Sequence, residues 1–308
     1  EPKEGPQGPQ GPQGQAKDGG QKKGGPQGPQ DNVAKVGKKE VEQGYDKQQQ
    51  AEKDLEQAKN DDASGKQGEA IEKLEQAKKE LEKLLRQLRE EELERILAAL
   101  QARCEKMLAM QKQVLAGTEA VAKAVEANAD KQPDRNNKQD SLKLSDNEGD
   151  IVVEATKAID ILEAEGSAIA FPEVFQQVRE DMKHVQRRLG VSDVAAVTQE
   201  IERDIIASLE DMIKALKKQR QDNKSDPSDS KPGQPPPAQD QKLIEQIAEL
   251  KMIRSLQVRV NNRTQTYGKM YQGEQAAEAG IRRELQDLSG RQERIFEITN
   301  RIAKGDNR

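Results

Sequence analysis

Apolar residues recur at alternating intervals of three and four between residues 69 and 127, the spacing of a heptad repeat. The series slips by one residue near positions 89–92 and then resumes. The pattern predicts one long helix with a narrow apolar seam, which is stable only against another helix, of this chain or of a partner. The seam positions are Ile71, Leu74, Leu81, Leu85 and Leu88 before the slip, and Leu93, Leu97, Leu100, Cys104, Met107, Val114, Thr118, Val121 and Val125 after it.

A second helix is expected after a polar stretch at 128–144, which we interpret as a loop. Ser145 and Glu148 have the S-x-x-E spacing of a capping box, in which two side chains satisfy free backbone N–H groups at a helix start. Gly166 fits the end of this helix, because glycine readily adopts the left-handed conformation found there.

Four more segments complete an all-α fold class of long amphipathic, coiled-coil-type helices and helical hairpins. Pro172 fits the first turn of the next helix, and Gly190 fits its end. Another amphipathic helix follows up to position 216, and helices at 241–270 and 274–304 close the chain.

Other stretches carry little apolar periodicity. Residues 1–32 contain short Gly-Pro-Gln repeats too broken for a collagen triple helix, and they predict a disordered tail. The apolar residues of 33–65 are too sparse for a firm stripe, so we expect weak helix or disorder there, with breaks at 60–62 and 64–65. The Pro-rich stretch 221–240 predicts a disordered linker. The expected organisation is therefore tail 1–32, weak helix 33–65, helical region 66–220, linker 221–240 and C-terminal helical pair 241–308.

Composition supports narrow helical stripes rather than one compact globule. Charged residues make up 35% of the 308 positions and aromatic residues only 2%, although aromatic side chains are the largest contributors to cores. Residues 241–308 carry 13 Lys and Arg against 9 Asp and Glu, whereas residues 61–240 carry 28 against 37. The C-terminal helices are therefore expected either to pair with the acidic middle or to present ordinary solvated faces.

The residue types that catalysis and cofactor binding require are scarce. His184 is the only histidine, and its polar setting predicts a solvated or salt-bridged side chain. Neither a phosphate-binding loop nor a zinc-ligand pattern is present, so we expect no enzyme, no cofactor and no small-molecule substrate site. No apolar run approaches the ~20 residues of a membrane-spanning helix.

The single cysteine, Cys104, occupies a seam position. Its simplest role is that of a small buried apolar residue. The alternative is a disulfide between equivalent seam positions of two parallel chains in an oxidising compartment.

Three cations, Arg254, Arg259 and Arg263, lie at intervals that favour a basic strip on one helix. Such a strip suits nucleic acid or another polyanion. Few aromatic residues lie nearby and the chain is acidic overall, so pairing with acidic helices of the same protein is the competing interpretation.

Four runs of ordinary helix-forming residues, at 91–125, 166–182, 199–216 and 247–267, resemble a family of bacterial, planctomycete-type helical proteins without an assigned activity. The resemblance spans roughly 90–304. It implies an exported, envelope-associated setting, with which a chain beginning at Glu1 after removal of a signal peptide would agree. It carries no functional residues.

We therefore expect a structural or protein-interaction protein that binds a protein partner or a second copy through its apolar seam. The candidate interaction residues are Leu93, Leu97, Leu100, Cys104 and Met107. Two alternatives stay open: nucleic-acid or polyanion binding through Arg254, Arg259 and Arg263, and a periplasmic chaperone-like helper that grips clients between helical arms.

Overall fold

The computed structural model describes residues 35–224, 244, 246–271, 273 and 275–305. Within these ranges the chain forms seven helices and no strand, which confirms the all-α class. The predicted tail at 1–32 and most of the predicted linker at 221–240 lie outside the described residues. Two compact units divide the chain between Leu84 and Leu85, and each is considered by itself.

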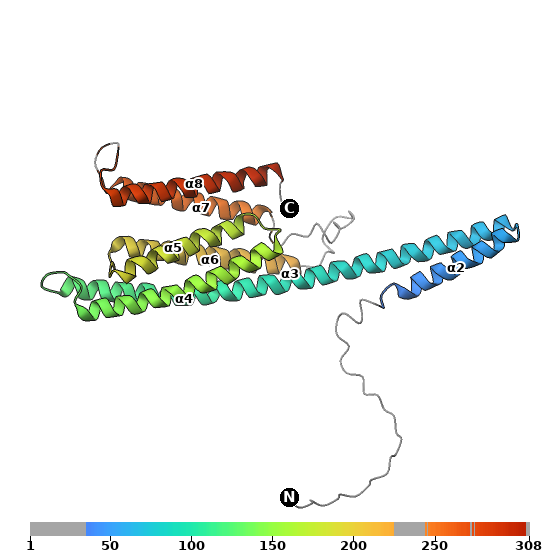
Figure 1. The fold of residues 1–308 in the computed structure, drawn as a ribbon, viewed down its shortest axis with the longest axis horizontal. Coiled ribbons are helices and arrows are strands. Elements are labelled where there is room, and N and C mark those ends of the chain that lie inside the picture. Colours follow the sequence, from blue (N-terminus) through green and yellow to red (C-terminus); the bar gives the residue numbers. More distant parts are fainter. Residues whose placement is uncertain (1–34, 225–243, 245, 272, 274, 306–308) are drawn as a thin grey trace, which may run out of the picture. The chain divides into compact units, whose positions relative to one another are not determined.

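The first unit contains a helical hairpin, formed by α2 (Lys38–Glu56) and residues 60–84 of α3 (Asn60–Ala127). The two helices lie side by side in Figure 1 and are joined by a short turn in which Ala58 has a φ of 58°. An ion pair of 2.5 Å between Lys47 Nζ and Glu69 Oε2 links them.

Small residues form the contact between the two helices of the hairpin. Gly44 packs so closely that a Cβ there would lie 3.2 Å from Leu74 Cγ. Small side chains at seven-residue intervals let the backbones approach in this way. The buried small residues are Gly37, Gly44 and Ala51 on one helix, and Ala63, Ala70 and Ala77 on the other.

The expectation for residues 33–65 needs correction. Instead of breaking at 60–62 and 64–65, the chain turns earlier, at 57–59, and α3 continues through Ser64 and Gly65. Asp61 and Asp62 lie in the first turn of α3, where carboxylates interact favourably with the positive end of the helix. The polar cluster is thus a helix start.

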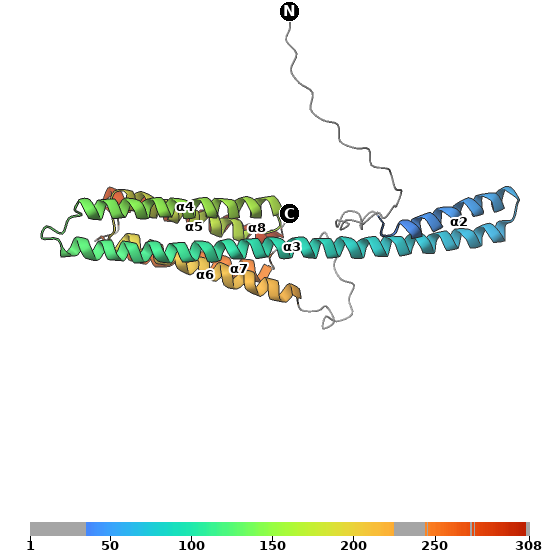
Figure 2. The ribbon, with the colours of Figure 1, turned by 90° about the horizontal axis from the view of Figure 1, so that it is seen from below.

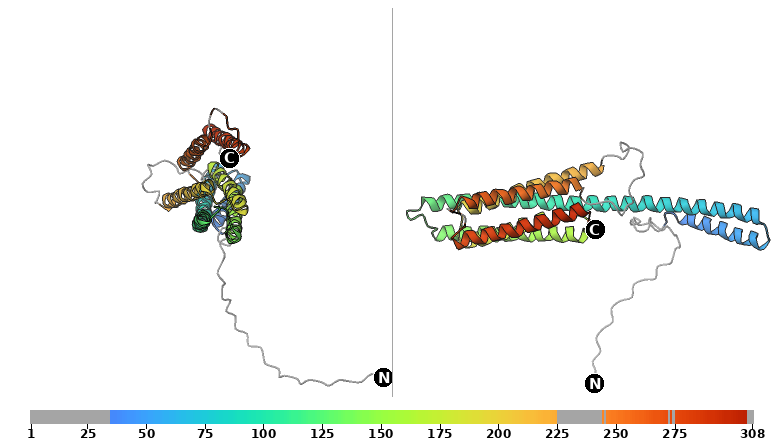
Figure 3. Two further views of the ribbon diagram at one scale, coloured as in Figure 1. Left: turned by 90° about the vertical axis from the view of Figure 1, so that its left-hand side faces the viewer. Right: turned by 90° about the horizontal axis from the view of Figure 1, so that it is seen from above.

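The second unit contains the rest of α3 and five further helices. Figures 2 and 3 show α3 beside α4, and Figure 1 shows α7 and α8 together on one side of α5. Helix α5 contacts α4, α6, α7 and α8, and Phe171, Phe175, Met182 and Leu189 on it are fully buried. The five helices are α4 (Arg135–Glu165), α5 (Ala170–Gly190), α6 (Ala196–Lys224), α7 (Gln246–Gly268) and α8 (Ala279–Lys304).

Helix α4 begins eleven residues before the predicted start. Asp134 is its N-cap and forms a capping box with Asn137, whose backbone N–H donates to Asp134 Oδ1 over 2.8 Å. The predicted box at Ser145 and Glu148 lies inside the helix: Ser145 Oγ donates to the Gln186 carbonyl, and Glu148 is buried. The S-x-x-E spacing there reflects contacts with other helices.

Other helix ends follow the sequence signals. Gly166 and Gly305 end α4 and α8 in the left-handed conformation, with φ of 78° and 72°. Pro172 lies in the first turn of α5, and Gly190 is the last residue of that helix. Helix α6 continues to Lys224, four residues into the predicted linker.

The start of α5 is capped by another helix. Its own N-cap residue, Ile169, supplies no side-chain acceptor. Glu249 Oε1, from α7, accepts the backbone N–H groups of Ile169 and Ala170 at 2.5 and 3.0 Å. A buried carboxylate at this position satisfies free N–H groups and interacts with the helix dipole, so it links α7 to α5.

We expect Glu249→Ala to lower the free energy of unfolding by about 1–3 kcal/mol, because two buried N–H groups lose their acceptor. Urea unfolding followed by circular dichroism measures the change. Glu297→Ala, at an exposed position of α8, is the control and should change the free energy by less than about 0.5 kcal/mol. Equal effects of the two changes would contradict the capping role.

Candidate functional site

The five predicted interaction residues on the seam of α3 lie inside the second unit. Leu93 is 3% exposed, and Leu97, Leu100, Cys104 and Met107 are 0% exposed. They belong to one core cluster with buried residues of α4, α5, α6, α7 and α8, so these side chains are covered by helices of their own chain. This corrects their assignment as a binding surface.

Cys104 is a free thiol in this core. Burial raises its pKa to about 12, so the reactive thiolate is suppressed. Because its side chain faces residues of its own chain, the geometry does not suit a disulfide between two copies.

The three arginines of the expected basic strip point to different places. Arg254 is exposed, whereas Arg263 is 7% exposed and donates to Asp204 Oδ2 through Nε over 2.7 Å. Arg259 is half-buried and donates to Ser208 Oγ, while its Nη2 has no hydrogen-bond partner among the described residues. The strip is therefore not a continuous surface for a polyanion.

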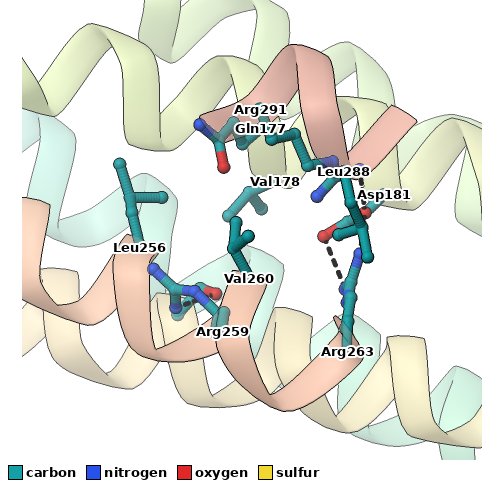
Figure 4. Close-up of a pocket in the computed structure, with 10 residues that line it drawn as sticks. Gln177, Val178, Asp181, Leu256, Arg259, Val260, Arg263, Leu288 and Arg291 are labelled. Atoms are coloured by element: carbon teal, nitrogen blue, oxygen red, sulfur yellow. Dashed lines mark hydrogen bonds and ion pairs between the residues drawn. The ribbon is translucent and has the colours of Figure 1, made fainter. Parts of the chain in front are cut away.

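Asp181 on α5 is the centre of the arginine cluster. Arg263 donates to both of its carboxylate oxygens at 2.8 Å, and Arg291 from α8 donates to Oδ1 at 2.5 Å, as Figure 4 shows. Burial opposes the charged form of Asp181, but the two guanidinium groups outweigh it and hold its pKa below the usual range. Three helices are thereby joined by one buried carboxylate.

Two buried carboxyl groups interrupt the apolar contacts of α3. Gln111 Nε2 donates to Glu148 Oε2 over 3.0 Å, and Thr118 Oγ1 donates to Glu202 Oε1 over 2.7 Å. Burial raises the pKa of Glu148 to about 8 and that of Glu202 to about 7. At neutral pH Glu148 is thus mostly protonated and Glu202 partly protonated, which reduces the negative charge in the core.

His184 lies 3.3 Å from Glu284 Oε1, so it has a carboxylate neighbour as the sequence suggested. Burial lowers its pKa, against the opposing effect of Glu284. Among the described residues, no group of three or more His, Cys, Asp and Glu side chains is arranged to hold a metal ion. Nor do the helices that the structure describes include one with the length and hydropathy needed to cross a bilayer.

Three cavities adjoin α7. Two of them, one beside Asp181 and Arg259 and one beside Tyr267, have about 10 Å³ each, room for about one water molecule. The third is an open groove of about 570 Å³ between α6 and α7, where apolar Ile247 and Val258 lie among both cations and carboxylates. Arg254 lines this groove and not the first cavity.

The hairpin of the first unit exposes large apolar side chains on both of its helices. Six large apolar side chains on it are between 39% and 62% exposed. We call this set the apolar side of the hairpin. It comprises Val41, Tyr45 and Leu55 on α2, and Ile71, Leu74 and Leu81 on α3.

Heptad counting places all six residues on one side of the hairpin. If Gly37 and Ala63 are taken as the first positions of heptads, the six residues occupy second or fifth heptad positions. Around the helix axis, these positions lie within about 100° of the buried contact, in the same direction of rotation on each helix. In two antiparallel helices these positions lie on a common side. On the opposite side, the third, sixth and seventh positions between Lys39 and Lys83 are all polar or Gly.

The seam pattern predicts that Ile71, Leu74 and Leu81 pack against another helix. Leu74 and Leu81 do lie beside Gly44 and Gly37 of α2, but all three side chains remain 39–58% exposed. The sequence pattern does not reveal the apolar side, because Val41, Tyr45 and Leu55 alone form no stripe on α2. The signal that reveals it is the seven-residue spacing of Gly37, Gly44 and Ala51, and of their partners on α3.

Comparisons with protein-family models, with curated proteins and with solved structures found no match to this chain. The resemblance to bacterial helical proteins therefore stays an expectation.

The buried carboxyl groups predict stability that falls as pH rises. Their pKa values in the folded state exceed the ordinary 4.5, so the folded chain holds more protons than the unfolded chain between about pH 4.5 and 8. We expect the free energy of unfolding to decrease over this range by several kcal/mol, at about 1.4 kcal/mol for each unit of raised pKa.

The double variant Glu148→Gln/Glu202→Gln should flatten this dependence, because amides need no proton to stay neutral. Denaturant unfolding at pH 5 and pH 8 measures the difference, with Glu297→Gln as the exposed control. If the double variant loses stability from pH 5 to pH 8 as steeply as the wild type, the two carboxyls do not hold these protons.

Asp181→Asn should lower the free energy of unfolding by about 3–5 kcal/mol, because two buried guanidinium groups lose their counter-charge. The combined variant Asp181→Asn/Arg263→Met should recover part of the loss, which a double-mutant cycle measures. An Asp181→Asn variant as stable as the wild type would show that the cluster contributes nothing.

Proposed function

We propose that this chain is a structural or protein-interaction protein that binds another helical element through the apolar side of the hairpin, in the manner of a coiled coil. The observation that carries the proposal is the contrast between the hairpin, whose small residues are buried while Val41, Tyr45, Leu55, Ile71, Leu74 and Leu81 are exposed, and the second unit, whose α3 seam is buried.

The apolar side of the hairpin gathers exposed apolar residues on one surface. Soluble monomers expose single apolar residues routinely, but a contiguous apolar patch with a polar surround marks an interaction site. Here six such residues fall on one side of two helices, and polar residues or Gly occupy the other side. A helix laid along this side would bury its own apolar stripe at the same time.

The proposed function gives the buried carboxyl groups no catalytic role. The perturbed carboxyls, Asp181, Glu148 and Glu202, are held by ion pairs or hydrogen bonds inside the second unit. Their environments account for stability and helix register.

Position-specific crosslinking in cells that express the protein tests the proposal. A photoreactive phenylalanine analogue replaces Tyr45 or Ile71 on the apolar side, or Gln50 or Gln76 at exposed seventh positions on the other side. We expect protein adducts at Tyr45 and Ile71 and none at Gln50 and Gln76.

The adduct at Tyr45 should also disappear when Leu74→Asp is added, because a charge at this position disfavours burial of the apolar side. Circular dichroism checks that the variant keeps its helices. Equal adducts on both sides, or none on either, would overturn the proposal.

A further inference from the structure

The partner can be specified further, on the basis of the proposed function. We infer that the apolar side of the hairpin binds the same surface of a second copy of this chain, with the two hairpins antiparallel. The positions of the charged residues on this side of the hairpin support this pairing.

The side of the hairpin that carries the apolar residues has twelve second and fifth heptad positions on its two helices. Three of these positions hold charged residues, Lys38, Glu52 and Lys78. Gly37 packs beside Ala77, which places Lys38 and Lys78 at the same level along the hairpin. Glu52 lies 14 residues further along α2, about 21 Å away at 1.5 Å per residue. Positive charge therefore marks the open end of the apolar side, and negative charge marks the end near the turn.

Two copies can meet face to face about a twofold axis in two ways. In a parallel pair, α2 of one copy lies over α3 of the other, and Lys38 faces Lys78 of the second copy. In an antiparallel pair, α2 lies over α2, and Lys38 faces Glu52 of the second copy twice. Charge complementarity therefore selects the antiparallel pair.

The antiparallel pair also aligns the apolar residues. Tyr45 lies midway between Lys38 and Glu52, so it falls near the twofold axis, and the other members of the apolar side flank it in both copies. Existing partners of the two lysines oppose pairing little: Lys38 with Glu42 and Lys78 with Glu82 are exposed ion pairs of 3.6 and 3.7 Å.

The dimensions suit a homodimer interface. Helix α2 has 19 residues, so the face is about 28 Å long, and two adjacent helices make it about 20 Å wide. These dimensions give a footprint of about 560 Å², below the roughly 800 Å² that each partner contributes to a standard interface, so they suit a weak, reversible dimer. Between Lys38 and Lys83 positive and negative charges are interspersed, so two copies do not repel strongly.

Sedimentation velocity of the full chain over a range of concentrations tests the inference. We expect a reversible dimer, and a dimer dissociation constant raised by about a hundredfold or more by Leu74→Asp or Ile71→Asp. Gln76→Asp, an exposed change on the opposite side, is the matched control and should leave the constant unchanged. Circular dichroism verifies that each variant folds.

Charge reversal tests the orientation. In the antiparallel dimer, Lys38→Glu should raise the dissociation constant by roughly tenfold, because at each of the two symmetric contacts a new carboxylate then faces Glu52 of the other copy. Lys38→Glu/Glu52→Lys should restore it, and Lys39→Glu, at an exposed third position, should change it little. A parallel dimer would instead be strengthened by Lys38→Glu, which overturns the inferred orientation.

The outcomes separate this inference from the proposed function. A chain that stays monomeric at all concentrations, or a dimer equally affected by Leu74→Asp and Gln76→Asp, would overturn self-association through the apolar side. Adducts to a different protein at Tyr45 and Ile71 would still support the proposed function. An absence of adducts at both positions would remove the proposed function as well.

Discussion

Helix α5 has acidic residues on a side that must be buried, and the second unit is built around this constraint. Arg263 and Arg291 bind Asp181, and Arg294 binds Glu173 and Glu180 at 2.8 and 2.9 Å. All three arginines come from α7 and α8, the cationic end of the chain. The other side of α5 packs its phenylalanines into the apolar core. Charge therefore determines where the last two helices lie, and the expectation that they pair with the acidic middle is confirmed.

Sequence patterning was sufficient for much of the second unit. The heptad series from Leu93 to Val121 is buried, and the glycine signals at positions 166 and 305 end helices. It failed where one pattern has two physical meanings. An S-x-x-E spacing suits a helix start or the middle of a buried helix, and only the packing of α4 against its neighbours shows that Glu148 is in the core.

Candidate interaction residues were predicted poorly for the same reason. An apolar seam indicates that its residues must be buried, and a basic strip indicates that its charges must be paired. Neither pattern indicates whether the same chain or a partner provides the contact. Leu97 is covered by helices of its own chain, and Arg263 by the carboxylates of Asp181 and Asp204. The exposed surface on the hairpin depends instead on small residues such as Gly44, which a search for large apolar residues passes over.

The small residues of the hairpin have a consequence for its folding. A buried methylene contributes about 0.8 kcal/mol, so contacts between glycine and alanine stabilise a helix pair far less than contacts between leucines. Two-helix units of this kind have little stability of their own. Under the proposed function, order in α2 is therefore coupled to the occupancy of its apolar side, and its amide protons exchange slowly only when that side is covered.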